Sequence, residues 1–205
     1  MRPDGRISPL RAKAFLLVFD GFADWEPALA LCEINKSGKF EVVTTGFSDR
    51  RVTTMGGLKI SPETTLDAVN LTETAILVLP GGEMWEQESH PRLIALLDWL
   101  EEGHVPIAAI CGATLEVTRA GLTRGRRHTS NSKGYLKARV PGYRDEEFYV
   151  DELAVTDRDV ITASGLGSVE FAREVILRLS IYGEAQTQEW YEMFKRGVIP
   201  ARYAL

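Results

Sequence analysis

Three short apolar runs, each ending at a turn that contains glycine, constrain the fold of this chain most strongly. They cover residues 13–19, 75–79 and 105–110, and none alternates with polar residues as a half-exposed strand would. Strands that are apolar throughout are typical of parallel sheets with helices on both faces. Segments with helical spacing of apolar residues follow each run. We therefore predict an α/β fold of the flavodoxin-like type, with a doubly wound, mostly parallel sheet in a single domain.

The rest of the chain fits one domain with a short leader. Residues 1–12, which are rich in Arg, Pro and Gly, are predicted to be a loose leader, and residues 13–205 to form the domain. A hairpin is expected at 52–60 and a strand pair within 150–163. Residues 133–147 show no clear period and are predicted to be a long surface loop. The domain is expected to end in an amphipathic helix over 184–196.

Composition excludes several classes of function. The net charge is −5, and no basic run is interleaved with aromatic residues, so we expect no nucleic-acid partner. No apolar run approaches the ~20 residues needed to span a bilayer, so we expect no membrane association. Two cysteines without zinc-like spacing predict neither a disulfide framework nor a metal site. We expect a cytoplasmic protein without a cofactor, in which a free thiol can be reactive.

Cys111 is the strongest candidate for a reactive group. It follows the apolar run 105–110 directly, where a strand is expected to give way to a helix, and Ala109 and Ala113 flank it at two residues' distance. Small residues at these places are required by the sharp turn of a nucleophile elbow. The N–H groups of the following helix favour thiolate, so we expect a pKa below that of an ordinary cysteine. The alternative is a buried core cysteine, which is our interpretation of Cys32 in the first helix.

Two glycines and two tryptophans complete the predicted site. The backbone N–H groups of Gly82 and Gly112 could form an oxyanion hole, although the Pro-Gly-Gly sequence at 80–82 also suits a plain turn. Trp25 and Trp85 flank the two loops and could line a compact apolar pocket for a small substrate. Core packing or dimer contacts are the alternatives for both indoles.

Several motifs together resemble the ThiJ/PfpI family of the class I glutamine amidotransferase-like superfamily, which includes the parkinsonism-linked stress protein. They are Asp-Trp-Glu-Pro at 24–27, Leu-Pro-Gly-Gly at 79–82, Ala-Ala-Ile-Cys-Gly-Ala at 108–113, the segment 121–131, and Ile-Thr-Ala-Ser-Gly at 161–165. The resemblance covers about residues 13–180. It implies that Cys111 is the elbow cysteine and that the carboxyl of Glu26 hydrogen-bonds the sulfur.

The chain departs from the family pattern in its histidines. Family peptidases and many glyoxalases carry histidine directly after the cysteine, where this chain has Gly112. The stress-protein branch has histidine at the position of Asn131, which we take as the third site residue. No histidine follows His128, although glutamine amidotransferases require one late in the chain. We therefore expect neither glutamine amidotransferase nor peptidase activity, and no Cys–His dyad.

Three functions remain open on these grounds. The first is an enzyme whose Cys111 adds to a small carbonyl, amide-like or isonitrile substrate, as a hydrolase, an amidase or a glyoxalase-like lyase. The second is a non-catalytic oxidative-stress or redox-sensing protein that uses the same cysteine. The third is a ligand-binding domain. Substrate, general base and oligomeric state stay open: the last helix, with Trp190, Tyr191 and Phe194, could form a homodimer contact or pack on its own sheet.

Overall fold

The apolar runs form the centre of one large sheet. The computed structural model describes residues 11–87 and 89–200. The main sheet has seven strands in the order β5-β2-β1-β6-β7-β9-β8, and its neighbours pair in parallel except for β8, which is antiparallel to β9. Two further strands pair as an antiparallel hairpin. The strands are β1 Ala12–Val18, β2 Phe40–Gly46, β3 Val52–Thr53, β4 Lys59–Ile60, β5 Thr64–Thr65, β6 Thr74–Leu79, β7 Ile107–Ile110, β8 Ala154–Asp157 and β9 Val160–Ala163.

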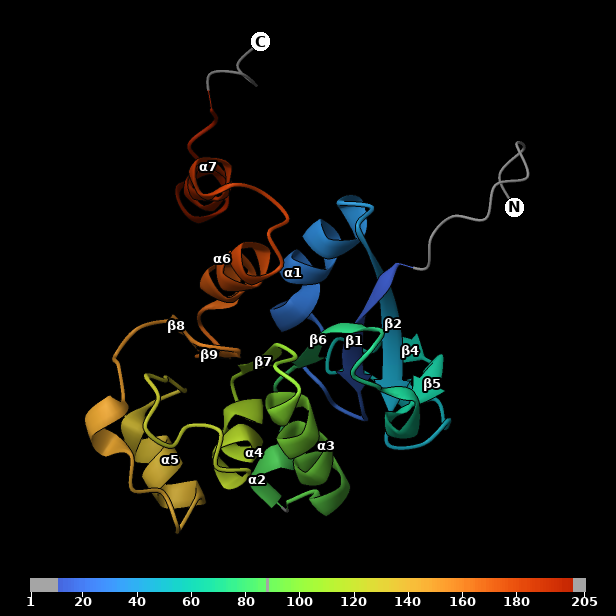
Figure 1. Ribbon diagram of the computed structural model, residues 1–205, viewed down its shortest axis with the longest axis vertical. Coiled ribbons are helices and arrows are strands. Elements are labelled where there is room, and N and C mark those ends of the chain that lie inside the picture. The colour runs from blue at the N-terminus through green and yellow to red at the C-terminus, as the bar shows by residue number, and fades with distance from the viewer. Residues whose placement is uncertain (1–10, 88, 201–205) are drawn as a thin grey trace.

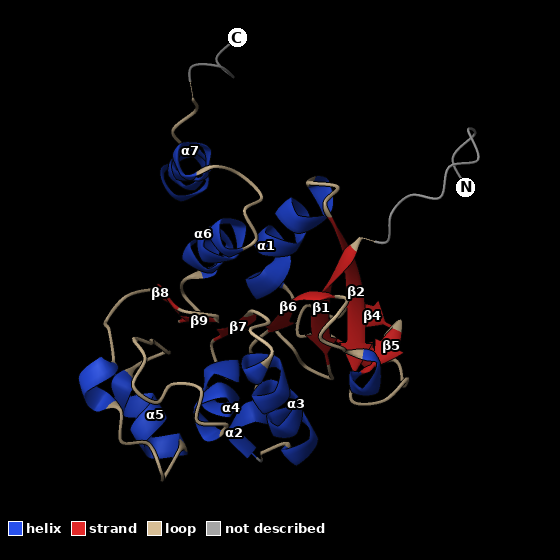
Figure 2. Ribbon diagram, in the orientation of Figure 1, coloured by secondary structure: helices blue, strands red, loops and turns tan. Residues whose placement is uncertain are grey.

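Helices cover both faces of this sheet. Figure 1 shows α1, α6 and α7 on one side of the strands and α2, α3, α4 and α5 on the other, and the same three layers stand out by colour in Figure 2. The helices are α1 Trp25–Lys36, α2 Met84–Gln87, α3 Pro91–Glu102, α4 Ala113–Arg119, α5 Lys133–Arg139, α6 Ser168–Arg178 and α7 Glu184–Arg196, with short 3-10 turns η1 Leu66–Ala68 and η2 Glu146–Phe148. The predicted doubly wound, mostly parallel fold is confirmed.

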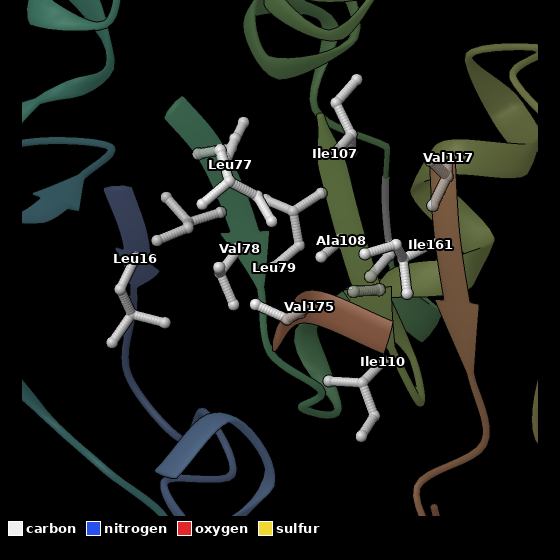
Figure 3. Packing of buried hydrophobic residues seen from close by; sticks show 14 of the residues in the cluster. Leu16, Leu77, Val78, Leu79, Ile107, Ala108, Ile110, Val117, Ile161 and Val175 are labelled. Carbon is white, nitrogen blue, oxygen red and sulfur yellow. The ribbon is translucent and has the colours of Figure 1, made fainter. Parts of the chain in front are cut away.

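The core follows from helices on both faces. Leu77, Val78 and Leu79 are successive residues of β6 that point to opposite sides of the sheet, yet all three are fully buried. Figure 3 shows these side chains together with residues of the neighbouring strands, such as Leu16 of β1 and Ile107 of β7. A strand that is buried on both faces gains nothing from polar alternation, which explains the continuous apolar runs.

The carboxyl ends of β1, β6 and β7 place three loops at one edge of the sheet. Because these strands are parallel neighbours, the residues that follow them lie side by side. The loop after β1 leads into α1, whose first turn carries Glu26, while the loops after β6 and β7 carry Gly81 with Gly82 and Cys111. Ligands of open α/β sheets bind at this edge.

One expected loop contains a helix. Residues 133–147 hold α5 and part of η2 instead of a continuous surface loop. Ser132 begins α5, since its side-chain oxygen accepts a hydrogen bond from the N–H of Tyr135 at 3.0 Å. The expected leader at 1–12 lies almost wholly outside the described residues.

Helix α1 exposes a cysteine and buries a glutamate. Cys32 is exposed, so its interpretation as a core residue was wrong. The buried side includes Glu33 as well as Ile34. Burial of Glu33 is tolerated because its carboxylate accepts hydrogen bonds from Lys36 at 2.8 Å and from Tyr182.

The last helix packs on α6 and not directly on the sheet. Trp190 is buried, while Phe194 stays 44% exposed. The hydroxyl of Tyr191 donates to Glu170 of α6 at 2.8 Å, and Lys195 forms an ion pair with the same carboxylate at 2.9 Å. Within residues 11–87 and 89–200, no helix has the length and apolar character needed to cross a membrane.

Candidate active site

Cys111 occupies a strained turn between β7 and α4. Its φ is +59°, in the left-handed region that non-glycine residues rarely adopt. The turn is fixed on both sides: the N–H of Cys111 donates to the carbonyl of Ala163 at 2.9 Å, and the N–H of Thr114 donates to the carbonyl of Cys111 at 3.1 Å. Ala109 and Ala113 are fully buried around it. These features match the nucleophile elbow expected from the small residues on each side of the cysteine.

Two glycines give the thiol its space. A Cβ on Gly81 would lie 2.6 Å from the Cβ of Cys111, and a Cβ on Gly165 would lie 2.9 Å from its sulfur. Both distances are below normal contact, so a side chain at either place would force neighbouring atoms to move. Gly165 was not among the predicted site residues. Its place in the sequence could have identified it, because Gly165 follows β9, which ends at the same edge of the sheet.

Glu26 lies next to the sulfur, as the resemblance implied. Its side chain is 2% exposed, and Oε2 accepts a hydrogen bond from the N–H of Gly81 at 2.6 Å. The carboxyl also hydrogen-bonds the thiol of Cys111. Burial raises the pKa of Glu26, against the opposite effect of the bonds from Gly81 and Cys111.

The thiol and the carboxyl titrate as a pair. Burial, and then the negative charge of an ionised Glu26, raise the pKa of Cys111 to about 11. The expectation of a thiol pKa below that of an ordinary cysteine is therefore wrong, with burial as the main reason. Burial raises both pKa values, and the adjacent sulfur and carboxyl can share one proton between them. The sulfur is a thiolate when that proton lies on Glu26.

Asn131 donates to the same sulfur. Its Nδ2 lies 3.4 Å from Sγ of Cys111, and its Oδ1 accepts the N–H of Gly165 at 2.9 Å. Since an N–H can donate only to the oxygen of the amide, the bond from Gly165 orients the amide nitrogen toward the sulfur. The N–H of Gly112 also bonds to Cys111, and both donors lower the pKa of the thiol.

Tyr135 borders the site from α5. Its hydroxyl donates to Glu86 of α2 at 3.1 Å, and Arg139 forms an ion pair with Glu86 at 2.7 Å. Burial, followed by the charge of Glu86, raises the pKa of Tyr135, and Cys111 contributes in the same direction. These contacts tie α5, which follows Asn131, to α2, which follows Gly82. Sequence reasoning missed them because it placed no helix at α5.

The two predicted oxyanion-hole glycines adjoin. A Cβ on Gly112 would lie 2.9 Å from the carbonyl oxygen of Gly82, and one on Gly82 would lie 2.7 Å from the ring of Phe19.

The two predicted pocket tryptophans differ in their exposure to solvent. Trp25 is 51% exposed at the start of α1, next to Glu26. Trp85 is fully buried and cannot line an open pocket: its Nε1 donates to the carbonyl of Pro80 at 2.9 Å, beneath the turn.

None of the three histidines of the chain forms a dyad with Cys111. His104 is exposed and lies 3.2 Å from Asp159. His128 is buried, with Nδ1 2.7 Å from the carbonyl of Arg126 and Nε2 2.7 Å from the hydroxyl of Tyr143. The ring of His90 stacks on Phe47 and contacts Trp85. All three are engaged elsewhere.

A cavity of about 590 Å³ lies beside the site, at the carboxyl ends of β1, β2 and β6. Its floor is apolar, with Phe19, Phe47 and Met84, and its rim carries Asp20 and Arg50. Phe19 separates it from the Gly82 turn. Among the described residues, no group of three His, Cys, Asp or Glu side chains is placed to hold a metal ion.

A three-layered α/β fold with a half-buried cysteine at a strained elbow, beside a buried glutamate, defines a class of elbow-cysteine proteins. The chain belongs to the DJ-1/PfpI family, whose family model matches residues 12–178. This confirms the family resemblance of the motifs.

Relatives in the family carry different names. The chain is 38% identical over 191 residues to a Bacillus subtilis protein named uncharacterized protease YoaZ, covering 89% of this chain and 90% of that protein. It is 31% identical over 119 residues to a deglycase of Thermococcus kodakarensis, covering 58% and 71%. A solved ThiJ/PfpI family protein from Bacillus anthracis superimposes with a TM-score of 0.86 at 36% identity, with 92% of each chain covered.

Proposed function

We propose that this protein is a cysteine-dependent enzyme that acts on small electrophilic carbonyl compounds, with chemistry of the glyoxalase or deglycase type. One observation carries the proposal: Glu26, Asn131 and the N–H of Gly112 all hydrogen-bond Cys111 at a left-handed turn. A strained residue persists only where its surroundings hold it in place, and such residues cluster at active sites. The deglycase names of three archaeal relatives support this class of substrate.

The first step is addition of the sulfur to a carbonyl carbon. The form of the pair with a thiolate and a protonated Glu26 supplies both reactants. As the carbon–sulfur bond forms, the carbonyl oxygen takes the electron pair and then the proton from Glu26, giving a hemithioacetal. For a 2-oxoaldehyde such as methylglyoxal, the carboxylate of Glu26 then takes the proton from the former aldehyde carbon and delivers a proton to the adjacent carbon, while the hydroxyl proton of the hemithioacetal passes to the adjacent oxygen. The resulting thioester is hydrolysed by water to lactate and free thiol.

The backbone and the rim have separate roles in this scheme. The N–H groups of Gly112 and Gly82 stabilise the negative charge that develops on the oxygen. Asn131 stabilises the thiolate before attack and the leaving thiolate afterwards. Trp25 supplies an exposed apolar surface beside Glu26. The backbone at Gly81 and Gly165 lies close to Cys111, so a compact substrate suits the site.

Peptide hydrolysis is a poorer match to this geometry. Release of an amine requires a general acid near the leaving nitrogen, and a histidine usually serves this purpose in cysteine peptidases. All three histidines of the chain are engaged away from Cys111. The word protease in the name of the Bacillus subtilis relative therefore does not decide the reaction here.

The direct test is turnover of methylglyoxal. We expect wild-type protein and the Cys32→Ser control to consume methylglyoxal and form lactate, and the Cys111→Ser variant to do neither. Cys32 is exposed on α1, so this control removes a thiol without touching the site. Equal turnover by the Cys111→Ser variant, or no turnover by wild type with methylglyoxal and related aldehydes, would reject the enzyme.

A redox sensor is the second candidate, and the buried carboxyl favours it. Burial raises the pKa of Glu26, and a protonated carboxyl beside the sulfur can donate a hydrogen bond to a sulfinate oxygen. If peroxide converts Cys111 to sulfinic acid stoichiometrically, as measured by mass spectrometry, while every carbonyl substrate stays unchanged, the sensor replaces the enzyme. Glu26→Leu should then lower the yield of sulfinate.

A further inference from the structure

A pair of buried hydroxyl groups lies behind the elbow. Thr114 is fully buried and Ser130 is 2% exposed, and their side-chain oxygens lie 2.6 Å apart. The hydroxyl of Thr114 also donates to the carbonyl oxygen of Cys111 at 2.6 Å. Because that hydroxyl has only one hydrogen, the hydroxyl of Ser130 must donate to Thr114. The order of donation is therefore Ser130 to Thr114 to the Cys111 carbonyl.

The carbonyl of Cys111 determines where the next N–H points. The peptide group between Cys111 and Gly112 is planar and trans, so its C=O and N–H point in opposite directions. A hydroxyl that binds the carbonyl on the side away from the sulfur therefore directs the N–H of Gly112 toward the sulfur. This N–H hydrogen-bonds the thiol of Cys111. The backbone N–H of Thr114 holds the same carbonyl at 3.1 Å, but it belongs to the helix and is present in any variant.

Ser130 is also the chain neighbour of the other donor. Asn131, the next residue, donates to the sulfur at 3.4 Å. The segment is held from behind at Thr129, whose N–H donates to the hydroxyl of Thr162 at 2.9 Å and whose hydroxyl donates to the carbonyl of Glu152 at 2.7 Å. Besides the Asn131 amide, the Ser130 hydroxyl links this segment to the elbow by a side-chain hydrogen bond.

We propose that Thr114 and Ser130 are positioning residues, which couple the two hydrogen-bond donors of Cys111 by fixing the elbow peptide relative to the Asn131 segment. This rests on the proposed function, in which Cys111 is the nucleophile. Neither hydroxyl touches the sulfur. Their effect on the reaction is indirect, through the aim of the Gly112 N–H and the placement of Asn131.

The test is the alkylation rate of Cys111 by iodoacetamide as a function of pH, measured at the level of the peptide by mass spectrometry. Exposed Cys32 is the internal reference in every sample. We expect Thr114→Val and Ser130→Ala to slow alkylation of Cys111 at pH 7 by about tenfold, the size of a lost hydrogen bond to a charged group, and to shift its profile to higher pH. Cys32 should react unchanged.

Thr118→Val is the matched control for the valine substitution. Its hydroxyl is buried on the same helix and donates to the carbonyl of Thr114 at 2.7 Å, one turn from the elbow. We expect it to leave the Cys111 profile unchanged. Thr114→Ser keeps the hydroxyl and should restore the wild-type profile, which a purely structural role of the threonine methyl would not do.

The double variant decides whether the two hydroxyls act in series. Ser130 acts through Thr114, so Ser130→Ala should have no further effect in the Thr114→Val background. Independent, multiplicative effects would overturn the proposal. An alkylation rate of Cys111 in Ser130→Ala that stays within twofold of wild type would also overturn it. Because Ser130 lies outside any helix, this variant tests the proposal even if Thr114→Val fails to fold.

The readout is separable from the proposed enzyme. Among the described residues, Glu26 of α1 and Tyr135 of α5 are the titratable groups that act on Cys111, and the substitutions leave both in place. Alkylation needs no substrate. If the alkylation profile shifts in the variants but wild type does not turn over methylglyoxal, the positioning role stands and the proposed enzyme is rejected. If wild type turns over methylglyoxal but the profile does not shift in the variants, the enzyme stands and the positioning role is rejected.

Discussion

Adding one methyl group above the sulfur should inactivate the site while leaving the fold in place. In Gly165→Ala, the new Cβ would start 2.9 Å from Sγ of Cys111 and 3.2 Å from Oε1 of Glu26. Relief to a favourable contact of ~3.5 Å requires the sulfur and the methyl to separate by roughly 0.6 Å. The contact from Asn131 to the sulfur is already 3.4 Å long, so a displacement of this size would break it.

The expected losses follow from this displacement. Overpacking of this kind costs about 1–3 kcal/mol, which lowers the melting temperature by roughly 2–4 °C per kcal/mol in a domain of this size. A misplaced reacting group should reduce kcat/KM by about a hundredfold. Thermal unfolding by circular dichroism measures the first effect, and methylglyoxal turnover with Cys111 alkylation measures the second.

Gly142→Ala is the control for the same substitution. A Cβ at Gly142 meets no atom within 4 Å, so stability and turnover should match wild type. If Gly165→Ala also retains wild-type melting and alkylation, the sulfur does not occupy the position described above. The coupling between the thiol, the carboxyl and Asn131 would then lose its geometric basis.

Three further predictions concern charge and capping. Burial lowers the pKa of His128, so the unfolded chain binds a proton at this imidazole more tightly than the folded chain does. The free energy of unfolding should therefore fall as the pH drops below about 6.5. In denaturant titrations between pH 5 and 7.5, His128→Asn should reduce this dependence on pH. An unchanged slope would contradict the buried neutral imidazole. Ser132→Ala removes the N-cap of α5 and should cost about 1 kcal/mol in the same titrations; a loss below ~0.3 kcal/mol would argue against the cap. Glu26→Gln cannot shuttle a proton and should reduce methylglyoxal turnover by about 10²–10⁴-fold with Cys111 still alkylated, whereas full turnover would exclude Glu26 as the acid.

The central sheet could be predicted from the sequence because its strands are buried on both faces. The run at 13–19 is offset from β1 by one residue, and the run at 75–79 lacks only the first residue of β6. Helix α5 could not be found in this way, since Lys133–Arg139 contains a glycine and three basic residues and buries only Leu136. Its only local signal is the serine that precedes it.

The site was predictable where local sequence determines the chemistry. Small residues around Cys111 predicted a sharp turn, and the turn has a left-handed cysteine. Glu26 and Asn131 came from the family resemblance, because no local rule connects either to a thiol more than 15 residues away. Trp85 misled because burial depends on distant partners: Phe19 and His90 enclose its ring.

The backbone of Cys111 implies a conflict between durability and reactivity at this position. Left-handed φ suits glycine, so a chain with glycine at residue 111 would fold with less local strain than the native one. The fold thus retains a strained backbone conformation at residue 111, and the role of the sulfur explains why a cysteine is present there. A homologue that no longer needs the thiol could replace Cys111 by glycine and gain stability. The residue type at this turn would therefore indicate whether the thiol chemistry is still used.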